Sequence, residues 1–166
     1  MAARRQRVGL SQGPLRVYVD TSVFGGVHDD EFRAPSERFF AAVQGGAFTL
    51  LVSEALVVEI AAAPAPVRTT FDAHRTHMEA IETTAEAAEL AEAYLAARVV
   101  PAASRVDALH VALASIAGAD AVVSWNFKHL VQLRRIRGFH AVNVLRGYPL
   151  IEIRSPLEVV DDEEEA

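Results

Sequence analysis

Short apolar segments with strand character alternate along this chain with longer segments of helical periodicity. Residues 15–19, 48–52 and 120–124 are rich in Val, Leu, Tyr and Phe, as buried strands are. Residues 83–95 and 104–116 instead repeat their apolar side chains at helical spacing. Strands that alternate with helices are joined by right-handed crossovers and lie parallel in one sheet. The sequence therefore predicts an α/β fold of three layers, with a central parallel sheet of about four to five strands flanked by helices.

Turn and cap signals divide the rest of the chain into shorter elements. Ser53, Thr83 and Ser104 stand where a polar cap would begin a helix, and Gly118 stands where a helix would end. The predicted core face of the helix after Ser104 consists of Val106, Leu109, Leu113 and Ile116. The other expected helices cover about 36–44, 53–63, 67–74 and 127–137, and the other expected strands cover 78–81, 141–144 and 150–153.

The composition suits one ordinary domain without thiol chemistry. The chain has 166 residues, of which 51% are hydrophobic and 23% charged, and it lacks cysteine, which excludes disulfides and Cys-ligated zinc. We find neither a membrane-spanning run nor a secretory signal, so we expect a cytoplasmic protein with no membrane partner. We expect residues 1–14 to form a flexible lead, 15–153 the folded domain, and 154–166 an acidic C-terminal tail without fixed structure.

Asp20 is the first polar residue at a position where open α/β sheets form their sites, the carboxyl end of a strand. It directly follows the predicted strand 15–19, and Ser22, two residues further on, can orient its carboxylate. The alternative is that Asp20 only makes a turn or caps the next segment.

The helix that begins after Ser53 carries two glutamates in different surroundings. Glu54 lies in the first turn, where a carboxylate suits the helix dipole and needs no other role. Glu59 is about 140° further round the helix, on a face that is otherwise apolar. A carboxylate on an apolar face needs a cation or hydrogen bonds to remain charged. Glu59 is therefore either a metal ligand or the partner of an arginine.

Asp107 and His110 lie one turn apart near the start of the helix after Ser104. A serine followed three residues later by an acid is a capping arrangement in its own right. The start of a helix also favours the ionised carboxylate that a metal ligand requires. For His110 the commoner role is that of a hydrogen-bonded structural histidine, and the alternative is a ligand.

The residues after the predicted strand 120–124 offer a further polar group. Asn126 can give a carbonyl oxygen to a metal ion or contact a nucleic acid. We expect Trp125 to pack in the core, with stacking on a base as the alternative.

Three carboxylates from separate junctions, Asp20, Glu59 and Asp107, would repel one another if the fold brought them together. A hard divalent cation resolves that repulsion, and ligation by oxygen alone favours Mg²⁺ or Mn²⁺ over zinc.

Taken together and in order, these segments resemble the PIN-domain family, and more closely its VapC-like toxins of bacterial type II toxin–antitoxin systems. The resemblance extends from Arg16 to Tyr148 and lies in segments 19–22, 53–59, 107–114 and 118–126. It implies a PIN-like fold and a metal-dependent endoribonuclease whose metal ligands are Asp20, Glu59 and Asp107. It also implies that Asn126 takes part in catalysis while Ser22 and Ser124 support the ligands. The implied partners are an RNA substrate, a second copy in a homodimer, and an antitoxin protein that crosses the acidic cleft.

One position departs from the family pattern, because many PIN domains carry a fourth acid where this chain has Asn126. The missing charge favours one bound ion over a fixed pair, and Asp120 stands at the start of its strand, at the wrong end of the sheet to substitute. The departure also motivates a second hypothesis, a catalytically weak or inactive PIN scaffold that binds RNA or a protein. A nucleotide-binding or phosphatase-like domain is disfavoured, since residues 20–22 lack a second aspartate and the chain has no Gly-rich phosphate loop.

Basic residues gather just after Asn126. Between 128 and 146 the chain has no acid, and its cations are Lys128, Arg134, Arg135, Arg137 and Arg146. Lys128, Arg134, Arg135 and Arg137 are candidates for contacts to RNA phosphates. The three arginines can also complement the C-terminus of their own predicted helix, or meet an acidic antitoxin.

Overall fold

The central sheet has five strands, all parallel, in the order β3-β2-β1-β4-β5. The computed structural model describes residues 13–160. The strands are β1 (Leu15–Val19), β2 (Phe48–Val52), β3 (Met78–Ala80), β4 (Ala121–Val123) and β5 (Glu152–Arg154). The predicted α/β fold with a parallel sheet is confirmed.

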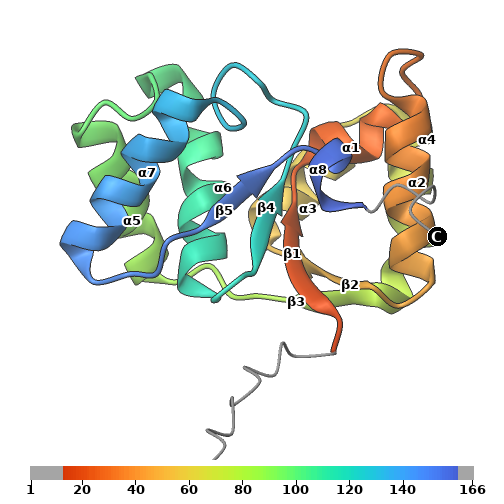
Figure 1. Cartoon of the computed structure of the whole chain (residues 1–166), viewed down its shortest axis with the longest axis horizontal. Coiled ribbons are helices and arrows are strands. Elements are labelled where there is room, and N and C mark those ends of the chain that lie inside the picture. The colour runs from red at the N-terminus through yellow and green to blue at the C-terminus, as the bar shows by residue number, and fades with distance from the viewer. Residues whose placement is uncertain (1–12, 161–166) are drawn as a thin grey trace, which may run out of the picture.

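Helices cover both faces of the sheet and complete the three layers (Figure 1). They are α1 (Thr21–Gly26), α2 (Arg33–Gln44), α3 (Glu54–Ala61), α4 (Ala65–Ala73), α5 (Ala85–Ala96), α6 (Arg105–Ile116), α7 (Leu133–Arg146) and α8 (Pro156–Val159). Helices α5, α6 and α7 lie on one side of the sheet, and α1 to α4 with α8 lie on the other (Figure 1). No helix within residues 13–160 is long and apolar enough to cross a membrane.

Side chains of β1 alternate between two hydrophobic cores, as the pleat of a strand requires. Tyr18 belongs to the core under α5, α6 and α7, whereas Val17 and Val19 belong to the core under α1 to α4. Because β1 is buried on both faces, its sequence is almost continuously apolar until Asp20.

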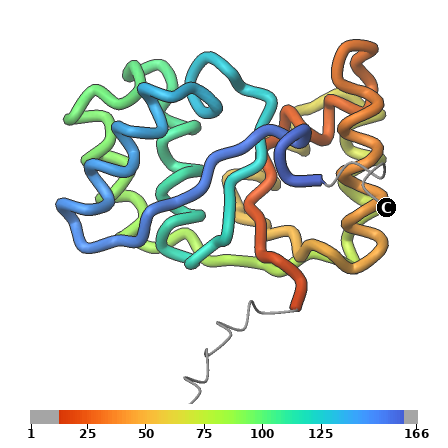
Figure 2. The backbone as a smooth tube through the Cα atoms, viewed as in Figure 1, coloured from red at the N-terminus to blue at the C-terminus, as the bar shows by residue number. Residues whose placement is uncertain are grey.

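The chain reverses its direction of travel across the sheet at β1. From β1 it moves through β2 to the edge strand β3, and then it returns to the other side of β1 to form β4 and β5. Such a reversal opens a crevice beyond the carboxyl ends of the two strands. The tube in Figure 2 shows the segments that follow β1 and β4 lying side by side at this end. Residues 20 and 124–126 therefore share one edge of the sheet.

Helix α7 is the largest departure from the elements expected from the sequence. A helix over 127–137 and a strand over 141–144 were expected. The helix is confirmed only over residues 133–137 and the strand is wrong, because one helix covers residues 133–146. The side chain of Gln132 accepts a hydrogen bond from the Arg135 amide and begins the helix, and Gly147 ends it at a positive φ of 77°. The apolar alternation near 141–144 belongs to a helix face that buries Phe139 and Val142.

Smaller differences concern caps and ends. Thr84 rather than Thr83 caps α5, by accepting a hydrogen bond from the Ala87 amide. On α6, Leu113 is buried as predicted, but Val106 is 48% exposed, and the buried residues are Ala108 and residues 110–115. The folded part extends through residue 160, because β5 ends at Arg154 and α8 packs against the core of α1 to α4. The rest of the expected tail (161–166) and the lead (1–12) lie outside the described residues.

Candidate metal centre

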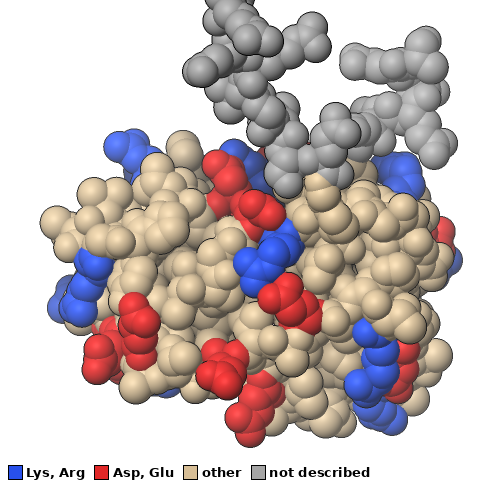
Figure 3. Space-filling view, turned by 90° about the horizontal axis from the view of Figure 1, so that it is seen from below, with Lys and Arg blue, Asp and Glu red and all other residues tan. Residues whose placement is uncertain are grey.

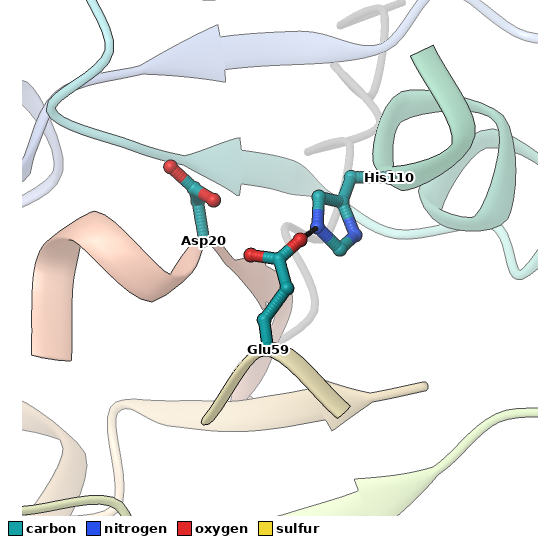
Figure 4. A group of neighbouring side chains, drawn as sticks. All are labelled: Asp20, Glu59 and His110. Atoms are coloured by element: carbon teal, nitrogen blue, oxygen red, sulfur yellow. Dashed lines mark hydrogen bonds and ion pairs between the residues drawn. The ribbon is translucent and has the colours of Figure 1, made fainter. Parts of the chain in front are cut away.

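The polar residues singled out by sequence meet at the carboxyl edge of the sheet, although they come from distant segments. Asp20 follows β1, Glu59 lies on α3, and His110 lies on α6 (Figure 4). One potential ligand atom of each of these three residues lies within 4.8 Å of the other two. Asp107 lies one turn before His110 on α6 and is close enough for Asp20 and Glu59 to affect its ionisation.

Asp20 is 7% exposed and is held by two serines. The hydroxyls of Ser22 and Ser124 both donate to its Oδ2, each at 2.8 Å. Its side chain makes no capping hydrogen bond to α1, so the alternative of a simple cap is not what the structure shows. Because both donors use one oxygen, Oδ1 receives no hydrogen bond from residues 13–160 and remains available to a ligand.

Glu59 has hydrogen-bond donors on both of its oxygens. Thr21 Oγ1 donates to Oε2 at 2.8 Å, and His110 Nε2 lies 2.5 Å from Oε1. Burial opposes ionisation of this carboxyl, but the hydrogen bond and charge of His110 together with the Thr21 hydrogen bond outweigh it and lower the pKa. The expected alternative partner, an arginine, is wrong: the partner of Glu59 is a histidine.

The surroundings of Asp107 oppose its ionisation. Burial, the nearby charge of Asp20 and the weaker effect of Glu59 raise its pKa to about 6, while His110 and Asn126 act in the opposite direction. Ser104 makes no side-chain capping bond, so the capping arrangement weighed for Ser104 and Asp107 does not form. Apart from burial, the main influence on the pKa of Asp107 is therefore the negative charge of a neighbouring carboxylate.

The side chain of Asn126 turns its NH₂ group, rather than its carbonyl oxygen, toward this cluster. Its Oδ1 accepts the backbone amides of Lys128 and His129, at 3.2 and 2.9 Å, and so forms the turn after β4. Its Nδ2 lies 3.4 Å from Asp107 Oδ2. The expected carbonyl contact to a metal is thus replaced by a donor that faces Asp107.

Trp125 packs against its neighbours, as expected, and fixes the segment that carries Ser124 and Asn126. It is 6% exposed, its indole N–H donates to Ser36 Oγ at 2.9 Å, and its ring stacks on Phe32. Gly26 makes this packing possible, because a Cβ there would lie 2.7 Å from the indole nitrogen.

The basic residues beyond Asn126 separate into two kinds. Lys128, Arg134 and Arg137 are exposed, whereas Arg135 is half-buried and donates to the Val99 carbonyl at 2.8 Å. The interpretation that the arginines complement the end of their helix is wrong, since Arg134, Arg135 and Arg137 lie in the first half of α7. Their charge adds to the positive end of the helix dipole instead of opposing its negative end.

No lysine or arginine within residues 13–160 forms an ion pair with Asp20, Glu59 or Asp107. Their crowded carboxylate oxygens match the ligands that Mg²⁺ and Mn²⁺ prefer, and a divalent cation would offset the charge that raises the Asp107 pKa. The donor set therefore fits a hard divalent ion.

Sequence reasoning did not identify two residues that order the site, Thr21 and Tyr18. Thr21 binds Glu59, and the Tyr18 hydroxyl lies 2.6 Å from Ser53 Oγ and 2.5 Å from His110 Nδ1. A usable signal for Tyr18 existed, because it precedes Asp20 by two positions and so shares its face of the strand. A buried tyrosine hydroxyl also requires a partner.

Comparisons with known proteins address the family. No curated protein matches this chain. Among solved structures, VapBC2 from Rickettsia felis bound to a promoter DNA fragment superposes with a TM-score of 0.53 at 11% identity, covering 85% of this chain and 98% of that one. The Mycobacterium tuberculosis toxin VapC20, described as cleaving the sarcin–ricin loop, gives 0.52 at 18% identity, covering 68% of this chain and 92% of that one.

These structural likenesses show a shared fold, and a sequence match defines the family. The PIN-domain family matches residues 16–128, a segment that contains every residue of the metal centre from Asp20 to Asn126. The chain belongs to the PIN-domain family.

Proposed function

We propose that this protein is a metal-dependent endoribonuclease of the VapC toxin type. The observation that carries the proposal is the meeting of Asp20 and Glu59 at one edge of the sheet, with Asp107 close enough for both to affect its ionisation, and with no lysine or arginine paired to any of the three among the described residues. Family membership supports a nuclease activity, and the sarcin–ricin loop cleavage in the description of VapC20 supports an RNA substrate.

The proposed ligands of Mg²⁺ or Mn²⁺ are Asp20, Glu59 and Asp107. When bound, such an ion lowers the pKa of a water molecule and stabilises charge on the phosphate and the leaving oxygen. Ser22 and Ser124 hold the Asp20 carboxylate through Oδ2, and the Asn126 amide holds Asp107. These contacts fix the ligand oxygens before an ion arrives.

RNA must approach this acidic edge against charge repulsion. Lys128 lies in the turn that Asn126 forms, and Arg134 and Arg137 lie on the first turns of α7, all three exposed. We propose these three cations as phosphate contacts. Arg135 is a weaker candidate than the sequence suggested, since its guanidinium holds the Val99 carbonyl.

The proposed partners are a second copy of the chain and an antitoxin protein that blocks the acidic edge. The structure from Rickettsia felis is of VapBC2 with a fragment of promoter DNA, which supports an antitoxin partner. Co-purification of the chain with the product of a neighbouring small reading frame, with loss of nuclease activity in the complex, tests this part.

The central test is the variant Asp20→Asn, assayed for Mn²⁺-dependent RNA cleavage. Loss of the charge that binds the ion should abolish cleavage while circular dichroism shows an intact fold. Full activity in this variant would refute the assignment. If the folded wild-type protein cleaves no RNA at any Mg²⁺ or Mn²⁺ concentration but binds RNA, the inactive-scaffold hypothesis is correct instead.

A further inference from the structure

We propose that His110 is a positioning residue that holds Glu59 in place for the metal, and that it is not itself a metal ligand. This inference rests on the metal centre of the proposed function. His110 is fully buried, and it is one of the three residues whose ligand atoms converge, so a direct contact to the ion is the obvious competing role. The hydrogen bonds around its ring argue against that role.

Both ring nitrogens of His110 already have partners. Nε2 lies 2.5 Å from Glu59 Oε1, and Nδ1 lies 2.5 Å from the Tyr18 hydroxyl (Figure 4 shows the first contact). An ionised carboxylate only accepts hydrogen bonds, so Nε2 carries the hydrogen in this pair. A nitrogen that carries a hydrogen has no lone pair to give to a metal ion.

The hydrogen bonds continue past His110 and return to the helix that carries Glu59. Tyr18 Oη lies 2.6 Å from Ser53 Oγ, and Ser53 Oγ accepts the Leu56 amide at the start of α3. Glu59 lies further along the same helix. The chain of contacts from Ser53 through Tyr18 and His110 to Glu59 therefore closes a ring through α3, β1 and α6.

Because Ser53, Tyr18 and His110 are buried, each depends on its partners in this ring for its hydrogen bonds. Tyr18 and His110 are 0% exposed and Ser53 is 1% exposed, so water cannot replace a lost partner. A change at any member leaves another buried polar group without its partner.

The consequence for metal binding is that Glu59 cannot swing away from the site. His110 fixes Oε1 and Thr21 fixes Oε2, and each oxygen keeps a further lone pair for a ligand. A carboxylate fixed in this way loses less conformational freedom when it binds an ion. Groups that orient a ligand from outside typically change metal affinity by about 10–100-fold when they are removed.

The test measures Mn²⁺ affinity by calorimetry in the absence of RNA. His110→Ala should weaken binding by about 10–100-fold. His110→Gln places an amide N–H where Nε2 stands and should recover most of that loss. Tyr18→Phe keeps the ring and removes only the hydroxyl, and it should weaken binding less than His110→Ala. The matched control is His74→Ala, which removes another buried histidine, one that binds Thr70 and Gln44 rather than a carboxylate of the site.

A second measurement uses the unaltered protein and so does not depend on a variant that folds. Electron spin-echo spectroscopy of bound Mn²⁺ should show no coupling to a directly bonded ¹⁴N nucleus. Such a coupling, or a His110→Gln variant as weak as His110→Ala with its fold intact, overturns the proposal. Neither measurement uses RNA, so failure of the proposed ribonuclease activity is detected separately, by the cleavage assay.

Discussion

Acidic side chains lie near both ends of the parallel strands, the amino edge and the carboxyl edge of the sheet. Among residues 13–160 the acids near the amino edge contact an arginine, and those of the metal centre at the carboxyl edge do not. At the amino edge, Arg16 binds Glu79 through two contacts, of 2.8 and 3.0 Å, and its backbone amide donates to Asp120 at 2.8 Å. Figure 3 views the molecule from this side and shows basic and acidic side chains next to one another near the centre of the face. At the carboxyl edge, Asp20, Glu59 and Asp107 have no lysine or arginine partner among residues 13–160.

The difference is clearest between Glu79, an acid that supports the fold, and Asp107, an acid that is available for binding. The hydrogen bond from Arg16 lowers the pKa of Glu79, whereas burial and neighbouring acids raise that of Asp107 to about 6. An acid with a lowered pKa gains free energy from its place in the fold, and an acid with a raised pKa loses it. A site that costs stability without a ligand is expected where a ligand is bound.

The largest expected effect is on catalysis. Asp107→Asn should lower the rate of RNA cleavage by about a thousandfold, because a ligand charge is lost. Asp120→Asn, its counterpart at the amino edge, should leave the rate unchanged. The two variants are compared in one Mn²⁺-dependent cleavage assay, and equal losses in both would remove the distinction between the edges.

The next effect is on metal affinity as a function of pH. A proton and the metal compete for Asp107, so affinity should fall as the pH drops below about 6, approaching tenfold per pH unit. Calorimetric titration of Mn²⁺ between pH 5 and 8 measures it. In Asp107→Asn, where binding is weaker, this part of the pH dependence should be missing. An affinity that stays constant from pH 7 to 5 would contradict the assignment of Asp107 as a ligand.

A smaller effect is expected on stability without metal. Because the folded-state pKa of Asp107 is raised from 3.8 to about 6, the group's contribution to stability is fully present below pH 3.8 and is lost as the pH rises through 6. Asp107→Asn should therefore stabilise the protein at pH 7.5 by about 1–2 kcal/mol, with a smaller difference near pH 4.5. Urea unfolding in a chelator at the two pH values checks this. A destabilised variant at pH 7.5 would show that Asp107 serves the fold.

The smallest effect concerns the amino edge. Arg16→Gln should lower the free energy of unfolding by about 1 kcal/mol, since the ion pair with Glu79 is partly exposed and the guanidinium also holds the Ala117 carbonyl. Its Mn²⁺ affinity and cleavage rate should equal those of the wild type. Urea unfolding and the same two functional assays make the comparison, and a reduced Mn²⁺ affinity would mean that the edges are coupled.

The sequence was sufficient for those parts of the molecule that follow from local pattern. Strands β1 and β2 and the parallel sheet follow from short apolar runs between helical segments, and the positions of Asp20 and Glu59 follow from the elements that carry them. Helix α7 was mistaken because the alternation near residue 142 resembles a strand, and only packing of Phe139 and Val142 against the core shows the helical face.

The hydrogen bonds inside the site could not be predicted in the same way. Tyr18 and His110 are 92 residues apart in the chain, and Tyr18 and Ser53 are 35 apart, so no local spacing links them. The sequence pattern also could not predict the role of Asn126, because its side chain can present either its carbonyl oxygen or its NH₂ group to the site. The turn that follows β4 decides which, since that turn uses the oxygen.

The close approach of Gly26 to Trp125 and Ser36 has a genetic consequence. An added methyl group would lie 2.4 Å from Ser36 Oγ and 2.7 Å from the indole nitrogen, so the indole would have to move. Trp125 lies between Ser124, which contacts Asp20, and Asn126, which contacts Asp107, so we expect a movement of its ring to disturb both contacts. A screen for variants with reduced RNA cleavage should therefore recover replacements at position 26, even though that residue has no side chain to offer to metal or RNA.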